Sequence, residues 1–156
     1  MRDIASSWPL ALIRARQLGR NAIIALFALA LFGGIAVADD PIKVVYHVSD
    51  EDKVGFVLNN IQNHIDGVGG EDAIKVVLVA HGPAVKRLVD IDAVDRVRNA
   101  VAKLQGQGVV VEACAKTLTA FDLDPDELLA DIRIAERGGV TRIGELQTQG
   151  YVYIRP

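Results

Sequence analysis

The chain has 156 residues, room for one domain, and a net charge of −3 at neutral pH. Four of its arginines and one of its aspartates fall within residues 1–38, so the rest of the chain carries a net charge of about −6. An acidic domain without a basic run offers no surface for the phosphates of nucleic acid, and this excludes a nucleic-acid-binding protein.

Residues 1–38 have the pattern of a secretory signal peptide. Three arginines precede a stretch without charged residues from position 22 to position 38, and the small residues Ala36 and Ala38 end it. We expect cleavage after Ala38, a mature domain over residues 39–156 and a periplasmic location. The alternative is an uncleaved leader that anchors the protein in the membrane, facing the periplasm, although the apolar stretch is at the short limit for a span.

Strand and helix patterns alternate along the rest of the chain. Three runs rich in β-branched residues predict strands, over residues 42–48, 74–80 and 109–114. Apolar residues at helical spacing predict a helix over residues 53–68, after the first strand. The same spacing predicts a second helix after the second strand, capped by Asp90 or Asp92.

The last part of the chain repeats this alternation in a weaker form. A short helix is expected near residues 116–121, and a capping box that begins at Asp124 and Pro125 predicts a brief helix through Ala130. The later elements are predicted as a strand over residues 132–134, a helix over residues 140–150 and a strand over residues 151–154. The whole pattern predicts an α/β fold, a single three-layer α/β/α domain with a mostly parallel five-stranded sheet.

Three of the predicted strands end near side chains that can do chemistry. In an open parallel sheet, binding sites form beyond the carboxyl ends of the strands. The first strand ends near His47, the second is followed by His81, and the third ends on Cys114, the single cysteine of the chain. If these strands are neighbours in the sheet, the three residues share one edge of it.

Cys114 stands where a strand should meet the amino end of the next helix, and backbone N–H groups at such a junction stabilise an anion. We therefore predict that Cys114 is a reactive thiol, with His81, Lys116 and His47 as groups that could stabilise its thiolate. Other roles stay open. A lone cysteine can also be a buried hydrophobic residue or pair with a second copy of the chain, and His47 can simply complete the packing of its strand. His64, inside the first predicted helix, is expected to make a structural hydrogen bond.

No other chemical motif is present in the sequence. It contains no Walker sequence, no Cys-x-x-Cys and no G-x-S-x-G, which argues against a hydrolase or a dehydrogenase. The three histidines are far apart and lack the pairing of metal ligands, so we expect neither a metal nor a cofactor.

Five segments, in this order and spacing, resemble the DsrE/DsrF-like family, and within it the small exported members: residues 44–47, 59–65, 76–82, 114–118 and 149–156. The resemblance covers residues 43–156. It implies an α/β/α fold with a parallel five-stranded sheet, and assembly into oligomers that are often trimers or hexamers. In the best-understood members one cysteine carries a persulfide in a sulfur relay, and Cys114 is the position of this chain that matches that role.

The resulting hypothesis is an exported sulfur-relay protein that receives sulfane sulfur as a persulfide on Cys114. Its donor and acceptor would be partner proteins or small sulfur compounds, and the protein would be a carrier rather than a turnover enzyme. The alternative is a non-catalytic oligomeric module for binding or assembly, in which Cys114 is buried and structural. For a homo-oligomer, the edge formed by Phe56, Asn59 and Asn63 is the expected contact surface.

Overall fold

One parallel sheet organises the computed structural model of the protein, which describes residues 40–156. Its strands are β1 (Ile42–Val48), β2 (Ile74–Ala80), β3 (Val110–Cys114), β4 (Arg133–Ala135) and β5 (Val152–Ile154). They lie in the order β4-β3-β2-β1-β5, and each of the four neighbouring pairs is parallel. The predicted five-stranded parallel sheet is thereby confirmed.

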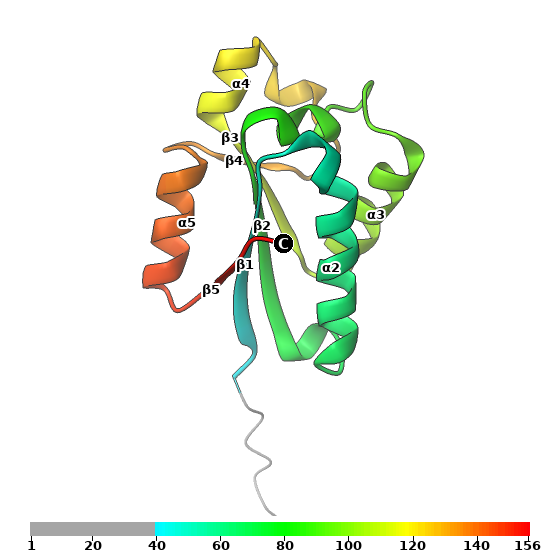
Figure 1. The fold of residues 1–156 in the computed structure, drawn as a ribbon, viewed down its shortest axis with the longest axis vertical. Coiled ribbons are helices and arrows are strands. Elements are labelled where there is room, and N and C mark those ends of the chain that lie inside the picture. Colours follow the sequence, from blue (N-terminus) through cyan, green and yellow to red (C-terminus); the bar gives the residue numbers. More distant parts are fainter. Residues whose placement is uncertain (1–39) are drawn as a thin grey trace, which may run out of the picture. The chain divides into compact units, whose positions relative to one another are not determined.

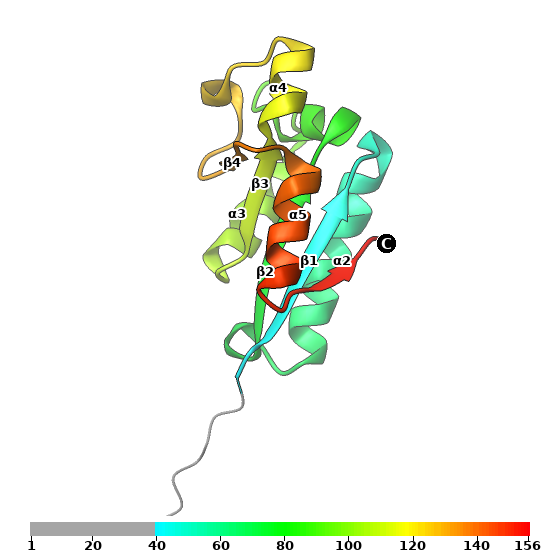
Figure 2. The same ribbon diagram turned by 90° about the vertical axis from the view of Figure 1, so that its left-hand side faces the viewer.

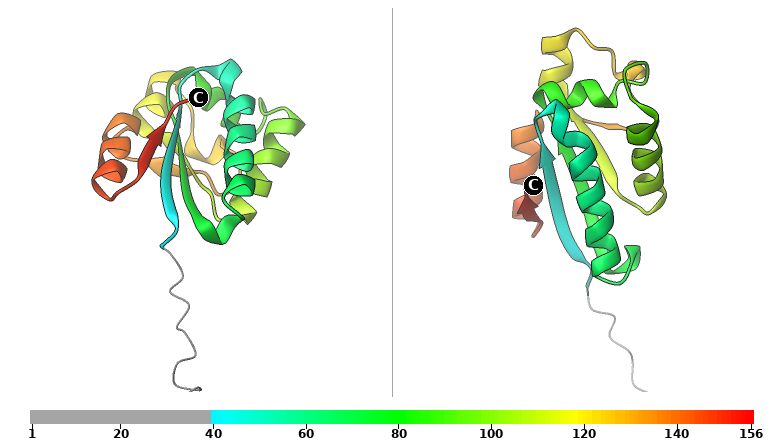
Figure 3. Two further views of the ribbon diagram at one scale, coloured as in Figure 1. Left: turned by 60° about the horizontal axis from the view of Figure 1, so that its bottom comes forward. Right: turned by 45° about the vertical axis from the view of Figure 1, so that its right-hand side comes forward.

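Helices cover both faces of this sheet and one of its ends. The longer helices are α2 (Val54–Gly67), α3 (Asp95–Gly106), α4 (Ala115–Phe121) and α5 (Gly139–Thr148), and short 3₁₀ helices are η1 (Glu51–Lys53), η2 (Glu71–Ala73), η3 (Gly82–Leu88) and η4 (Pro125–Glu127). Figure 1 and Figure 3 show α2 and α3 on one face, α5 on the other, and α4 beyond the carboxyl ends of the strands. This is the expected three-layer α/β/α fold.

The larger core lies between the sheet and the two helices α2 and α3. Because side chains alternate along a strand, Val44, Tyr46 and Val48 of β1 all point to this face. They pack against the stripe of α2 that contains Leu58 and Ile61, both at most 1% exposed. The hydroxyl group of Tyr46 lies 3.0 Å from Nδ1 of His64 on α2, which confirms the structural hydrogen bond expected for that histidine.

The opposite face has a much smaller apolar core. Val45, Val77 and Val79 from β1 and β2 pack there against Ile143 and Leu146 of α5. A single helix covers this face, and its aliphatic core extends as far as Val79, the last residue but one of β2. Beside and beyond Val79, toward the carboxyl ends of the strands, lie the polar residues that form the site described below.

The path of the chain explains why α5 lies on this face. Strand β4 is at one edge of the sheet and β5 at the other, so the helix between them has to return across the sheet. Figure 2 shows α5 crossing the face that α2 and α3 leave free. Its amino end therefore arrives beside the carboxyl ends of β2 and β3, where the sequence predicts a site.

Three local predictions differ from the structure. Helix α3 begins only at Asp95, because Asp90 forms an ion pair with Arg98 instead of capping the helix. The capping box at Asp124 is present, but it starts only the three-residue turn η4, and the expected helix through Ala130 is not formed. The segment after His81, where the pair Gly82-Pro83 predicts a turn, is the 3₁₀ helix η3.

The expected leader, residues 1–38, lies outside the described residues. Within residues 40–156, no helix combines the length and the hydrophobicity that crossing a membrane requires.

Candidate functional site

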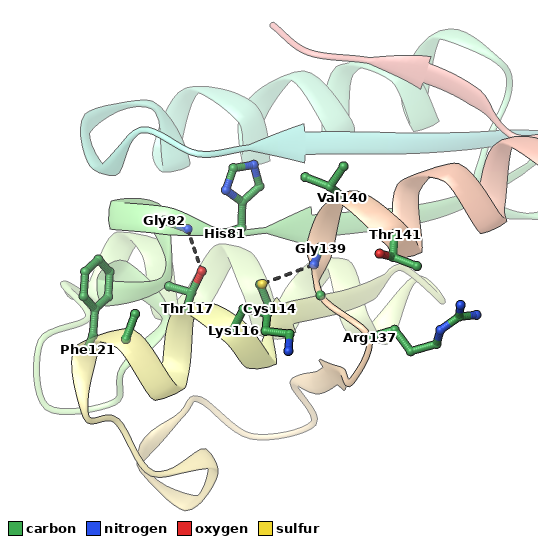
Figure 4. Close-up of a pocket in the computed structure, with 12 residues that line it drawn as sticks. His81, Gly82, Cys114, Lys116, Thr117, Phe121, Arg137, Gly139, Val140 and Thr141 are labelled. Atoms are coloured by element: carbon green, nitrogen blue, oxygen red, sulfur yellow. Dashed lines mark hydrogen bonds between the residues drawn. The ribbon is translucent and has the colours of Figure 1, made fainter.

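Cys114 lies at the floor of a pocket at the carboxyl edge of the sheet. It is the last residue of β3 and the residue that precedes α4, as the sequence predicts. Its side chain is only 5% exposed, yet it lines an open pocket of about 390 Å³ (Figure 4). The walls come from the end of β2, from α4 and from the turn that opens α5. The residue therefore borders the pocket, although most of its surface is covered.

The closest polar group to the sulfur is the first backbone amide of α5. The N–H of Gly139 donates a hydrogen bond to Sγ of Cys114, with a distance of 3.1 Å between nitrogen and sulfur. This amide is one of the free N–H groups at the helix start, and the helix dipole adds a partial positive charge there. Both effects favour the thiolate over the thiol.

Two glycines allow this close approach. Gly138 has a φ of 96°, a conformation that side chains with a Cβ rarely adopt. A Cβ on Gly139 would lie 3.3 Å from Cβ of His81 and 3.4 Å from Cβ of Cys114, tighter than ordinary contacts. The glycine pair thus lets the amino end of α5 rest directly on the sheet.

The surroundings of Cys114 lower the pKa of its thiol. Burial on its own raises this pKa, but the hydrogen bond from the Gly139 amide lowers it, as do groups of Thr117 and Lys116 at the start of α4. The Thr117 hydroxyl oxygen accepts the N–H of Gly82 at 2.9 Å, which leaves its hydrogen free to turn toward the sulfur. The net direction is downward, so the folded protein ionises this thiol more easily than a free cysteine.

His81 also lines the pocket, directly after β2, the neighbour of β3 in the sheet. Its pKa is lowered, chiefly by burial and further by the positive charge of Arg155, while Asp50 opposes the shift. The ring is therefore neutral at pH 7. A neutral imidazole can exchange a proton in the pocket, but the charge of the thiolate is stabilised by amides.

His47 lies one step behind His81 and does not line the pocket. The two rings are stacked, with 4.6 Å between their centroids. Nδ1 of His47 lies 2.7 Å from the hydroxyl oxygen of Tyr153, and its pKa is lowered to about 4, first by burial and then by His81 and Arg155. Its position supports the orientation of His81 rather than contact with a ligand.

Lys116 lines the pocket, as does Arg137 from the turn before α5. No carboxylate is among the residues that line it. Lys116 and two helix amino ends around one thiol make this pocket favourable for an anionic ligand, whereas the guanidinium of Arg137 is paired with Glu145 at 2.6 Å. Sequence reasoning identified Lys116 but missed Arg137, Thr117 and Gly139, because each reaches the pocket through the fold rather than through a motif.

No group of three or more histidine, cysteine, aspartate or glutamate side chains that could bind a metal occurs among residues 40–156.

Comparison with known proteins agrees with the resemblance seen in the sequence. The profile of the DsrE/DsrF-like family matches residues 43–156. No curated protein matches the chain. Among solved structures, MTH1491 from Methanobacterium thermoautotrophicum, a protein of unknown function, is 32% identical with a TM-score of 0.65, and the match covers 74% of this chain and 99% of that one.

Two more distant structures share the fold. The YchN protein from E. coli is 11% identical with a TM-score of 0.63, and the match covers 74% of this chain and 99% of that one. The protein BT1422 from Bacteroides thetaiotaomicron, also of unknown function, is 15% identical with a TM-score of 0.53, and the match covers 79% of this chain and all of that one (100%).

Adding a single methyl group at Gly139 tests whether its amide lowers the pKa of Cys114. Gly139→Ala should push the start of α5 away from the sheet and raise the pKa of Cys114 by about one unit, since the strongest hydrogen bond to the thiolate weakens. The pH dependence of alkylation by iodoacetamide measures this shift. Gly144→Ala is the matched control on the same helix, because a Cβ there has no atom within 4 Å. Equal midpoints in both variants would show that the amide does not set the pKa.

Proposed function

Because the chain belongs to the DsrE/DsrF-like family, which is associated with sulfur relay, we propose that it carries sulfane sulfur as a persulfide on Cys114. The observation that supports this most strongly is the contact between the Gly139 amide and the sulfur, 3.1 Å long and at the floor of an open pocket. A sulfur carrier needs one accessible nucleophile with a lowered pKa, and it needs no complete catalytic set.

The loading step requires no external oxidant. The Cys114 thiolate attacks the outer, sulfane sulfur of a donor such as thiosulfate or a low-molecular-weight persulfide. The new S–S bond forms as the old one breaks, and the electron pair of the old bond leaves with sulfite or with the donor's thiolate. Transfer onward is the same exchange in reverse, with an acceptor thiolate attacking the outer sulfur of the Cys114 persulfide.

The residues around the pocket suit both steps. The terminal sulfur of a persulfide is anionic at neutral pH, and Lys116 offers it positive charge. His81, neutral at pH 7, can take the proton of the thiol or return one to a leaving thiolate. Val140, 73% exposed, and Phe121, 37% exposed, form an apolar rim on which an acceptor can rest.

One observation favours the alternative, a binding or assembly module with a structural cysteine: the side chain of Cys114 is 5% exposed. The two functions separate in a loading experiment. Incubation of the native protein with thiosulfate or polysulfide should add the mass of one sulfur atom, removable by a thiol reductant and absent in Cys114→Ser. A cysteine that accepts no sulfur and reacts with alkylating reagents only after denaturation would support the module instead.

The anionic preference of the pocket gives a separate prediction. Lys116→Gln should slow alkylation of Cys114 by the anion iodoacetate relative to the neutral iodoacetamide, lowering the ratio of the two rates about two- to fivefold. The ratio is the useful quantity because a change in the thiol pKa affects both reagents alike. Lys103→Gln, an exposed lysine on α3, is the control. An unchanged ratio in Lys116→Gln would show that Lys116 does not attract anionic ligands.

We further propose that the protein acts in the periplasm after loss of residues 1–38, and that it forms a homo-oligomer such as a trimer or hexamer. Phe56 is 54% exposed on α2, beside the exposed Asn59 and Asn63, which suits a contact between copies. Native mass spectrometry of protein recovered from expressing cells tests both points. The expected result is several copies of a chain that begins at Asp39, and Phe56→Asp should reduce the number of copies. A monomer, or a chain that retains its leader, would contradict the respective proposal.

A further inference from the structure

A partly buried ion pair joins β3 to α5 directly behind Cys114, with 29% of the Arg142 side chain exposed. Glu112 lies two residues before Cys114 on the same strand and is only 4% exposed. Its two carboxylate oxygens accept hydrogen bonds from Nε and Nη2 of Arg142, at 2.8 Å and 2.9 Å. The guanidinium and the carboxylate thus meet in the two-point geometry that fixes both position and orientation.

The same face of α5 makes both contacts with β3. Gly139 and Arg142 are three residues apart, which places them one above the other on a helix. Gly139 binds residue 114 through its amide, and Arg142 binds residue 112 through its side chain. Residues 112 and 114 point to the same face of the sheet, since side chains alternate along a strand. The first turn of α5 is therefore attached to β3 at two residues, 112 and 114, that share one face of the strand.

Stability alone does not account for this pair. A buried ion pair contributes little net stability, and two apolar side chains of similar size often replace one without loss. A pair with this two-point geometry also fixes the position and orientation of α5 relative to β3. The remaining contacts of α5 with the sheet involve aliphatic side chains such as Val79 and Ile143, and these tolerate sliding of the helix. A shift of a few tenths of an ångström would already lengthen the hydrogen bond from Gly139 to the sulfur.

We propose that Glu112 and Arg142 are positioning residues that keep the amino end of α5 in register with β3, so that the Gly139 amide reaches the sulfur of Cys114. The inference deepens the proposed function, because a sulfur carrier at neutral pH depends on an ionised Cys114. Neither residue lines the pocket.

Two variants distinguish positioning from a direct effect of charge. Besides this pair, the charged and titratable groups around the thiol and the start of α5 are His81, Lys116, Arg137 and Glu145, which the variants leave unchanged. Glu145 lies 3.7 Å from Arg142 and also pairs with Arg137. If the pair acted only through its charges, Glu112→Gln would remove a negative charge and lower the pKa of Cys114, whereas Arg142→Gln would raise it. If the pair positions α5, both substitutions loosen the helix and both raise that pKa.

The experiment is the pH profile of iodoacetamide alkylation in Glu112→Gln and Arg142→Gln. We expect the midpoint to move upward in both variants, by up to about one pH unit. Arg87→Gln is the matched control, because it breaks an ion pair with Glu51 of 3.1 Å that has no contact with α5, and its midpoint should not move. The urea midpoint of each variant verifies that the protein is folded.

A double variant tests the shared route. Glu112→Gln combined with Gly139→Ala should shift the midpoint no further than the larger of the two single changes, because both act through one hydrogen bond. Where a single polar variant fails to fold, the apolar pair Glu112→Met with Arg142→Leu keeps the helix packed while it removes the directional contact. It should also raise the midpoint.

Shifts of opposite sign in the two single variants would overturn the positioning role in favour of direct charge. Unchanged midpoints in folded variants would leave the pair a purely structural role and would equally overturn the inference. The alkylation profile uses no sulfur donor, so its outcome is independent of persulfide loading. A protein that loads no sulfur but shows both upward shifts would disprove the proposed function and leave this inference intact.

Discussion

The site depends on one hydrogen bond, from the backbone of Gly139 to the sulfur of Cys114. A buried thiol in an apolar setting would have a raised pKa and would be inert. Burial is the largest single effect on this pKa, and the hydrogen bonds from Gly139, Thr117 and Lys116 reverse its direction only together, with that of Gly139 the largest among them. A backbone donor at a helix start is also fixed in place before any ligand arrives, so no reorganisation is needed when the thiolate forms.

The topology of the sheet brings this amide to the cysteine. Strands β1 to β4 follow one another in the sheet, in chain order, toward the edge formed by β4, and α2 and α3 lie on a single face. The return to β5 then takes α5 across the other face, where its first turn meets the carboxyl end of β3. On this face of the sheet, aliphatic residues such as Ile143 and Leu146 pack the middle and the carboxyl end of α5, and polar groups contact its amino end at the site.

Most of the architecture could be predicted from the sequence because it depends on local patterns. Continuous apolar runs mark the central strands, and helical spacing marks α2. Prediction from local patterns fails where a side chain makes a different contact from the one its pattern indicates. The carboxylate of Asp90 pairs with Arg98 instead of capping a helix. The capping box at Asp124 correctly predicts where a helical turn begins. It does not predict the length of that turn, because the residues beyond it do not form a helix.

The site could be predicted only in part. Cys114 follows from its place at a strand end, and Lys116 from its nearness in sequence. Gly139 and Arg142 lie 25 and 30 residues away from their partners in β3. No sequence pattern gives the order of strands, so none could reveal that α5 crosses back onto β3. A Gly-Gly pair reads as a turn, and its second role, close approach of a helix to the sheet, becomes visible only in three dimensions.

The central claim is that the fold itself makes Cys114 more acidic. It is tested most directly by comparing the alkylation midpoint of Cys114 in the native protein with that of the same protein unfolded in urea. The account predicts a clearly lower midpoint in the native protein, with loss of the difference on unfolding. A native midpoint equal to or above the unfolded value would contradict it, because the burial of the sulfur would then outweigh the amides around it.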